Sequence, residues 1–441
     1  MSFFSVVRDI ANFIWGPHML VFILGSGIYF SLRLKGIQFR QFIPAVRALS
    51  TSTRSSGAGN ITPYQALMSA LSGIVGNGNI AGVATAIVVG GPGTIFWMWI
   101  SALILMATMY SESLLGFRFR ARDKDGVYLG GPMVYIQKGL TWKWLALLFA
   151  IAMALKTLLA TTSIQSNSMS IVLHNQFDVP QIASCIVIAG LTWLVIIGGL
   201  KWIARTAQVL TPFMTIAYIL GGLAVITIHY DRIPTVLNEI VKYAFTPHGA
   251  VGGAGASAMM ALRFGAARGA YSNEAGTGSV AIMHATAQSK SAVNQSLISM
   301  LGVFIDTLII CSITALVILS SGIWTGGLNS TALVAESFSS ALAFGHWIVL
   351  GSSLLFGYST LIVWCFYGEQ CAAFIFGDKS KIFYRWLFCF AILIGATSNA
   401  ENIWSMGDLL NGLTVLINLV GIVALSSVVV KTTAEHVRTS N

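Results

Sequence analysis

The chain has 441 residues, of which 56% are hydrophobic and 9% are charged, and its formal net charge is +10. Soluble globular proteins carry about 25% charged residues, so the composition excludes an ordinary soluble domain and predicts an all-α polytopic membrane protein. The basic residues are spread over short loops, which argues against nucleic acid as a partner and favours the lipid bilayer.

Apolar segments of about 20 residues predict about eleven membrane helices in chain order. They lie near residues 16–33, 64–91, 94–117, 143–171, 181–200, 206–229, 250–286, 293–321, 346–376, 384–400 and 404–430. The first run lacks a basic leader and a small-residue cleavage site, so we expect it to be retained as a span. The segment 250–286 is the least apolar because Arg263, Arg268, Asn273 and Glu274 interrupt it.

Lysine and arginine predict the orientation of the spans. They are frequent in the loops 33–54 and 118–143, whereas the loops on the opposite side contain only Arg8, Arg232 and Lys242. Because basic residues favour the cytoplasmic side, we expect the N-terminus outside and the C-terminus in the cytoplasm. The predicted location is the plasma (inner) membrane.

The spans after the first form two sets of five with opposite orientation, which predicts an inverted repeat. We therefore divide the chain into an N-terminal span and basic loop (1–63), a first repeat (64–229), a second repeat (250–430) and a cytoplasmic tail (431–441). Each repeat opens with a glycine-interrupted span. Interrupted spans at matching positions of two halves are the best pointer to a transporter binding site.

The first interruption lies in the run Ser72–Gly82, which is rich in glycine and asparagine. Free amides at the start of a half-helix favour a carboxylate, and free carbonyls at the end of the other half-helix favour Na⁺. We expect the carbonyls of Ser72 and Val75 to bind sodium. The expected substrate-binding residues here are Gly76, Asn77, Gly78 and Asn79. The alternative is a close packing site in which the asparagines bridge helices.

The second interruption carries Glu274, an ionisable residue at membrane depth, and such residues are usually functional. Arg268 precedes it by six residues, so either Glu274 takes part in coupling or the two residues form a structural pair. Tyr271, Ser272 and Asn273 are then candidate substrate-binding or hinge residues.

Polar residues in other spans complete the candidate site. Ser359 and Thr360 offer hydroxyl oxygens to Na⁺, with bonding to their own helix carbonyls as the alternative. Trp364 lies one turn further and is a candidate wall of the pocket. Gln165 either reaches the substrate or bonds to another helix. Two further intramembrane acids, Asp306 and Glu112, are candidate proton or ion partners or structural pairs.

Long segments of the chain resemble the sodium:alanine (alanine or glycine:cation) symporter family. They are GNGNIAGVATAIVVGGPGTIFWMW at 76–99, GGPMVYIQKGL at 130–140, SIQSNS at 163–168, ARGAYSNEAGTGSVAIMHA at 267–285, MLGVFIDTLIICSITALVILSSG at 300–322 and GYSTLIVWCFYGE at 357–369. The resemblance implies the fold of the amino-acid and neurotransmitter:sodium symporters with one extra N-terminal helix. It also implies Na⁺-coupled uptake of alanine or glycine, with the first interruption, Gln165, Thr360 and Trp364 as pocket or ion residues.

These observations favour a sodium-coupled symporter of small neutral amino acids, with Na⁺ as the coupling ion and no organic cofactor. The alternatives are a proton-coupled carrier using Glu274 or Asp306, or a broader carrier of glutamine or serine. The sequence has no GxxxxGK[ST], HExxH or nucleophile elbow, which argues against ATP-driven transport and against the common hydrolases. Oligomeric state and stereoselectivity do not follow from the sequence.

Overall fold

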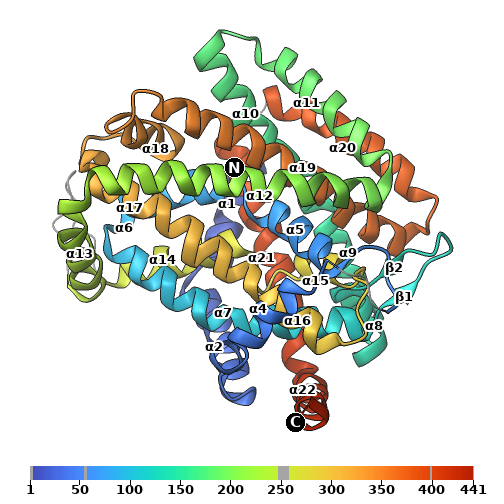
Figure 1. Cartoon of the computed structure of the whole chain (residues 1–441). Helices are drawn as coiled ribbons and strands as arrows, with labels where there is room; N and C mark the ends of the chain where they lie inside the picture. Colours follow the sequence, from blue (N-terminus) through green and yellow to red (C-terminus); the bar gives the residue numbers. More distant parts are fainter. Residues whose placement is uncertain (1–2, 54–56, 247–257, 398–399, 441) are drawn as a thin grey trace.

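The computed structural model describes residues 3–53, 57–246, 258–397 and 400–440. The remaining residues lie outside the described part, and with them the start of the expected span 250–286 and the end of the expected span 384–400. Within the described ranges the chain is almost entirely helical, with one small two-stranded sheet (Figure 1).

The N-terminal helices lead into the first interrupted span. They are α1 (Phe3–Ile14), α2 (Pro17–Arg33), α3 (Ile37–Arg40), α4 (Phe42–Ser50), α5 (Pro63–Ile74), the π-helix η1 (Gly78–Gly82), α6 (Val83–Gly90) and α7 (Gly93–Arg118). A capping box between Thr62 and Gln65, with Pro63 in the first turn, fixes the start of α5. Helix α5 and the segment Gly78–Gly90 meet at a bend of 54°, so the predicted first interruption is confirmed.

The middle of the chain begins with an antiparallel pair and continues as helices. The elements are β1 (Ala121–Arg122), β2 (Tyr128–Leu129), α8 (Pro132–Leu140), α9 (Lys143–Leu155), the π-helix η2 (Lys156–Thr161), α10 (Thr162–Phe177), α11 (Gln181–Ile196), α12 (Gly199–Ile228), the 3₁₀-helix η3 (Tyr230–Arg232) and α13 (Ile233–Phe245). Helix α11 stops four residues before the expected end of its span, and Gly199 with φ +65° starts the next helix.

The C-terminal part contains the second interrupted span. Its elements are α14 (Ala258–Asn273), α15 (Ser279–His284), α16 (Ala292–Val303), the π-helix η4 (Phe304–Cys311), α17 (Ser312–Ser321), the 3₁₀-helix η5 (Ile323–Thr325), α18 (Ser330–Ser339), α19 (Gly345–Phe376), α20 (Ser380–Thr397), α21 (Ala400–Ala424) and α22 (Ser426–Ser440). The gap between α14 and α15 confirms the second interruption. The expected last span ends early, at Ala424, and the tail is a separate helix.

The described helices have the length and apolar surface of membrane spans. Six are long and apolar enough to cross a bilayer, or eight if each bent pair is one span. On α12, Val209, Phe213 and Leu220 are each more than 60% exposed, which fits a surface that faces lipid rather than water. The chain is therefore a multi-pass membrane protein, whereas the count of eleven spans and the inverted repeat stay predictions.

The two interrupted spans lie next to each other inside the bundle. Helix α14 packs against α6, α7 and η1, and α19 packs against α5 and η2. Helix α21 passes behind these elements (Figure 1) and contacts η2 and α9. Two π-helices, η2 and η4, are features that the apolar pattern of the sequence did not indicate, and such segments are frequent at functional sites.

Candidate functional site

The first interruption leaves backbone groups without helical partners. Helix α5 ends at Ile74, and Val75 is extended with φ −78° and ψ 95°. Among the described residues, the amide of Asn77 donates no hydrogen bond and the carbonyl of Val75 accepts none. The amide of Gly76 donates to Asn79 Oδ1 at 2.9 Å. The break therefore offers both a free donor and a free acceptor at a buried position.

Three of the four expected sodium ligands, Ser72, Ser359 and Thr360, meet beside the end of α5. Ser359 Oγ and Thr360 Oγ1 each donate to the carbonyl oxygen of Ser72 at 3.3 Å, and Ser72 Oγ donates to the carbonyl of Ser359 at 3.0 Å. Both hydroxyls also donate to the carbonyl of Phe356, so the alternative of bonding to their own helix is present as well. The geometry brings hard oxygen atoms of two helices together, as a small cation requires.

Glu112 and Asn418, which belong to other helices, stabilise the second interruption by hydrogen bonds to its backbone. Glu274, Gly276 and Gly278 have φ of +58°, +91° and +80°, which ends α14. Glu112 Oε2 accepts from the amide of Gly276 at 3.1 Å and from Asn418 Nδ2 at 2.9 Å. Asn418 Nδ2 also donates to the carbonyl of Gly276 at 2.9 Å. Side chains of α7 and α21 thus replace the lost helical hydrogen bonds.

Asp306 of η4 joins the two interruptions. Its carboxylate accepts from Asn79 Nδ2 at 2.5 Å, from Ser272 Oγ at 2.8 Å and from Thr307 Oγ1 at 2.9 Å. Asn79 Nδ2 also donates to Ser272 Oγ at 3.0 Å. Asp306 is fully buried, and no lysine, arginine or histidine of the described residues forms an ion pair with it. Among the described residues, this carboxylate is therefore stabilised by hydrogen bonds and not by an ion pair.

A small cavity of about 50 Å³ lies between the two interruptions. It is lined by Gly73, Ile74, Gly76, Gly78, Lys156, Ala160, Thr161, Ile164, Gln165, Tyr271, Ser272, Glu274, Thr360, Trp364, Trp404 and Gly407. Backbone of the first break, polar side chains of the second break and aromatic rings therefore line one small space. Such a set suits a small zwitterion, with a few polar groups fixing its orientation.

Lys156 is the charged residue of this cavity that the sequence analysis missed. Its Nζ donates to Glu274 Oε2 at 3.2 Å and to Asn411 Oδ1 at 2.7 Å, and it lies 4.4 Å from the centre of the Trp364 ring. The prediction that Arg268 pairs with Glu274 is wrong, because Glu274 pairs with Lys156 and Arg268 lies over the ring of Tyr271. A lysine in the middle of the apolar span 143–171 was the available signal, because a buried lysine requires a counter-charge.

Related proteins match the chain along its whole length. A sodium/alanine symporter from Methanococcus maripaludis is 38% identical, over 98% of this chain and 97% of the relative. A probable sodium/glutamine symporter from Bacillus subtilis is also 38% identical, over 98% of this chain and 90% of the relative. The model of the sodium:alanine symporter family matches residues 1–441. The chain belongs to the sodium:alanine symporter family.

A member of this family is a transporter and not an enzyme, and a solved structure shares its fold. The structure of MhsT in complex with L-phenylalanine aligns with a TM-score of 0.56 at 13% identity, over 84% of this chain and 90% of that chain. At this identity the likeness concerns the fold alone. It agrees with the architecture that the resemblance implied for the sequence.

The cavity gathers six of the nine expected substrate-binding residues in this family member: Gly76, Gly78, Gln165, Tyr271, Ser272 and Trp364. The other three are not lining residues, and their side chains bridge helices, which for Asn77 and Asn79 is the alternative stated for the first interruption. Asn77 donates to Gln165 Oε1 at 2.9 Å and accepts from Ser353, and Asn273 donates to Thr307 at 3.1 Å. Asn79 bridges Asp306 and Ser272. Of the expected sodium ligands, Thr360 reaches the cavity and Ser72, Val75 and Ser359 lie behind it.

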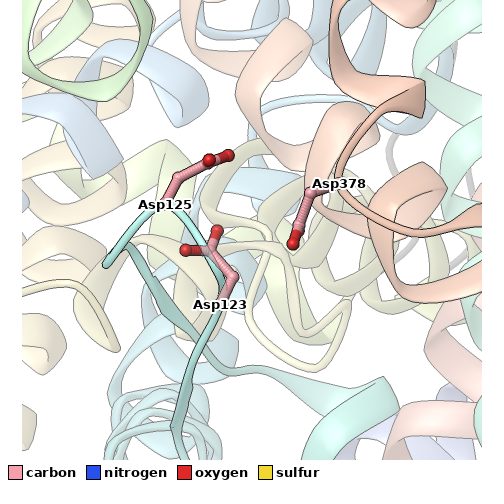
Figure 2. A group of neighbouring side chains, drawn as sticks. All are labelled: Asp123, Asp125 and Asp378. Carbon is pink, nitrogen blue, oxygen red and sulfur yellow. The ribbon is translucent and has the colours of Figure 1, made fainter.

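Three aspartates outside the bundle core form a separate acidic group, shown in Figure 2. Asp123 and Asp125 lie between β1 and β2, and Asp378 follows α19; one carboxylate oxygen of each lies within 4.8 Å of the others. Lys381 Nζ reaches them at 2.5, 3.5 and 3.3 Å. Burial lowers the pKa of Lys381, but the hydrogen bonds and charges of Asp123 and Asp378 outweigh this effect and raise it. The charged lysine thus supplies the positive charge that a metal ion would otherwise provide.

Lys381→Met is expected to loosen the β1–β2 hairpin from α20, because three carboxylates then repel one another without a cation. We expect a loss of about 1–3 kcal/mol of stability, reduced from the buried-pair range because Asp125 is exposed. Thermal unfolding in detergent and hydrogen exchange of residues 121–129 measure the effect. Lys379→Met is the control, since Lys379 is exposed and makes no ion pair among the described residues. Equal melting of the two variants would contradict this role.

Proposed function

We propose that this chain is a Na⁺-coupled symporter that carries small neutral amino acids, such as alanine or glycine, into the cell by alternating access. The observation that carries the proposal is the cavity between the two interruptions, with hydroxyl and carbonyl oxygens of α5 and α19 beside it. Membership of the family supports both the ion and the substrate class. Because one relative is a probable sodium/glutamine symporter, the alternative substrates are larger neutral amino acids.

In this proposal Na⁺ binds the carbonyl oxygens of Ser72 and Val75 together with the hydroxyls of Ser359 and Thr360. The ion replaces the weak hydrogen bonds from these hydroxyls and fixes the end of α5 against α19. The backbone of Gly78, which lines the cavity, then faces the carboxylate of the substrate, as at a helix N-terminus, and the free amide of Asn77 lies next to it in the chain. Ordering by the first ligand reduces the cost of binding the second, which couples the two.

The topology belongs to the same proposal. Eleven spans, with an extra first helix and two inverted repeats of five, would place the cavity near the middle of the bilayer. The N-terminus would lie outside, the C-terminus in the cytoplasm and the whole protein in the plasma membrane. Rocking of one repeat bundle against the other would open the cavity to each side in turn.

Purified protein in vesicles with an inward Na⁺ gradient is expected to accumulate alanine or glycine. Thr360→Ala is expected to raise the Na⁺ concentration needed for half-maximal uptake about tenfold, because one oxygen ligand is lost. Thr360→Ser keeps the hydroxyl and serves as the matched control. Equal uptake after replacement of Na⁺ by K⁺ at fixed pH would overturn sodium coupling.

Proton coupling is the second candidate, and Asp306 is the residue that favours it. This buried carboxylate has no cationic partner among the described residues, whereas Glu274 pairs with Lys156. A proton would neutralise it at little structural cost. In the same vesicles, uptake driven by an inward proton gradient without Na⁺ would support this mechanism in place of the first.

A further inference from the structure

An ion pair forms part of the wall of the cavity. Lys156 and Glu274 both line it, and their side chains are only 6% and 10% exposed. Lys156 is placed on the π-helix η2, and Glu274 occupies a left-handed position in the second interruption. A non-glycine residue at positive φ and a π-helix are both costly local structures that persist where the surroundings require them. Two independent distortions of the fold therefore bring these charges to the same cavity.

The ammonium group of Lys156 makes three contacts at the wall of the cavity. It donates to Glu274 Oε2 and Asn411 Oδ1, and the ring of Trp364 covers it at 4.4 Å. The ammonium is thus satisfied by an anion, an amide oxygen and an aromatic face.

Among the described residues, only one carboxylate oxygen of Glu274 accepts hydrogen bonds. Oε2 accepts from Lys156, from Thr277 at 3.0 Å and from Ser279 at 3.2 Å. Among the described residues, Oε1 of Glu274 accepts no hydrogen bond, although Glu274 lines the cavity. One carboxylate oxygen is consequently available to a ligand, while its charge is compensated by Lys156.

Charge balance at the cavity has a direct consequence for what enters it. With both partners present the side chains that line the cavity carry no net charge, so a charged substrate side chain finds no uncompensated counter-charge among them and must lose its hydration. With one partner removed, the other is left as a fixed charge beside the ligand. Like charges at such a contact are strongly unfavourable, and opposite charges are favourable.

We propose that the Lys156–Glu274 ion pair determines the charge selectivity of the cavity and restricts the substrate to amino acids with neutral side chains. The inference rests on the proposed function, because it assumes that the substrate is an amino acid. It adds a specificity-determining pair that acts through electrostatics rather than through pocket size.

Competition between amino acids of nearly equal size tests this proposal. Cationic 2,4-diaminobutyrate, neutral asparagine and anionic aspartate compete with labelled alanine for binding to the full-length protein in detergent with Na⁺. For Lys156→Met we expect the competition by 2,4-diaminobutyrate relative to asparagine to rise about tenfold, because Glu274 is then uncompensated. For Glu274→Gln we expect the competition by aspartate relative to asparagine to rise about tenfold, because Lys156 is then uncompensated.

Two further variants separate charge from damage to the fold. Lys156→Met combined with Glu274→Gln removes both charges and is expected to return the preference to asparagine over both charged compounds. Lys156→Arg keeps the charge and is expected to retain the wild-type order. Thermal unfolding of each protein identifies variants that no longer fold, and the competition order is then read from whichever single variant folds.

The outcomes distinguish this inference from the proposed function. If the wild type does not bind or accumulate alanine with Na⁺, the proposed function fails. If the wild type does so and the single variants keep the wild-type order of competitors, the proposed selectivity is wrong and the pair only stabilises the fold. A gain of the same charged compound in both single variants would also overturn it, since the two variants carry opposite charges.

Discussion

Gly76→Ala is expected to reduce Na⁺-driven uptake of alanine at least tenfold by filling the cavity between the two interruptions. A Cβ at this position would lie 3.0 Å from Thr360 Oγ1 and 3.4 Å from Gln165 Nε2. Both neighbours are buried, so they cannot move away without disturbing the hydrogen bonds to Ser72 and Asn77. The substitution therefore affects the substrate space and a proposed sodium ligand together. Uptake by vesicles and binding of labelled alanine measure the loss.

Gly82→Ala provides the matched control in the same interrupted span. A Cβ at Gly82 would meet no atom within 4 Å, and Gly82 does not line the cavity. Alanine also favours helix by about 1 kcal/mol over glycine, so the folded state is not expected to weaken. Uptake close to that of the wild type is expected. If both variants lose uptake equally, the flexibility of the glycine-rich run matters rather than the space at Gly76.

The sequence allowed both interruptions to be predicted because helix-breaking residues are rare inside apolar spans. Glycine and asparagine in the first, and glycine beside Glu274 in the second, each oppose a continuous helix. The approximate position of the long apolar helices also followed from apolar length. Ser359 and Thr360 were predicted as sodium ligands because adjacent hydroxyls on an apolar helix offer oxygen atoms to a hard cation, and bonding to their own helix carbonyls was the alternative.

The sequence did not reveal which polar residues face the cavity and which face another helix. Asn77 and Gly78 are neighbours in the chain, yet the side chain of Asn77 turns to Gln165 and Ser353 while Gly78 lines the cavity. That choice depends on the rotation of a distorted helix, and no periodic pattern fixes it within an interruption. The sequence also did not reveal which side chains pair between helices, because such partners can be far apart in the chain. Lys156 and Glu274 are 118 positions apart.

Glu112→Ala is expected to have the largest effect on stability, because Glu112 replaces missing backbone hydrogen bonds of the second interruption. Removal of its carboxylate leaves the amide of Gly276 and Asn418 Nδ2 without this acceptor in a fully buried position and opens a cavity. We expect a loss of about 3–5 kcal/mol, seen as a large fall in melting temperature and in the yield of folded protein. Loss of uptake would follow, since Gly276 lies in the same interruption as Glu274 and Ser272.

Glu112→Gln separates this structural role from a role in coupling. A glutamine keeps one oxygen for both donors, and its amide nitrogen takes the place of Oε1, which is buried without a hydrogen-bond partner. We therefore expect a change in stability within about 1 kcal/mol and an unchanged dependence of uptake on Na⁺. A Glu112→Gln protein that folds normally but loses its Na⁺ or pH dependence would assign the ionised carboxylate to coupling. The substitution preserves the shape of the side chain and removes only its charge. The ion dependence of uptake therefore distinguishes the structural role of Glu112 from a role in coupling, even if the melting temperature does not change.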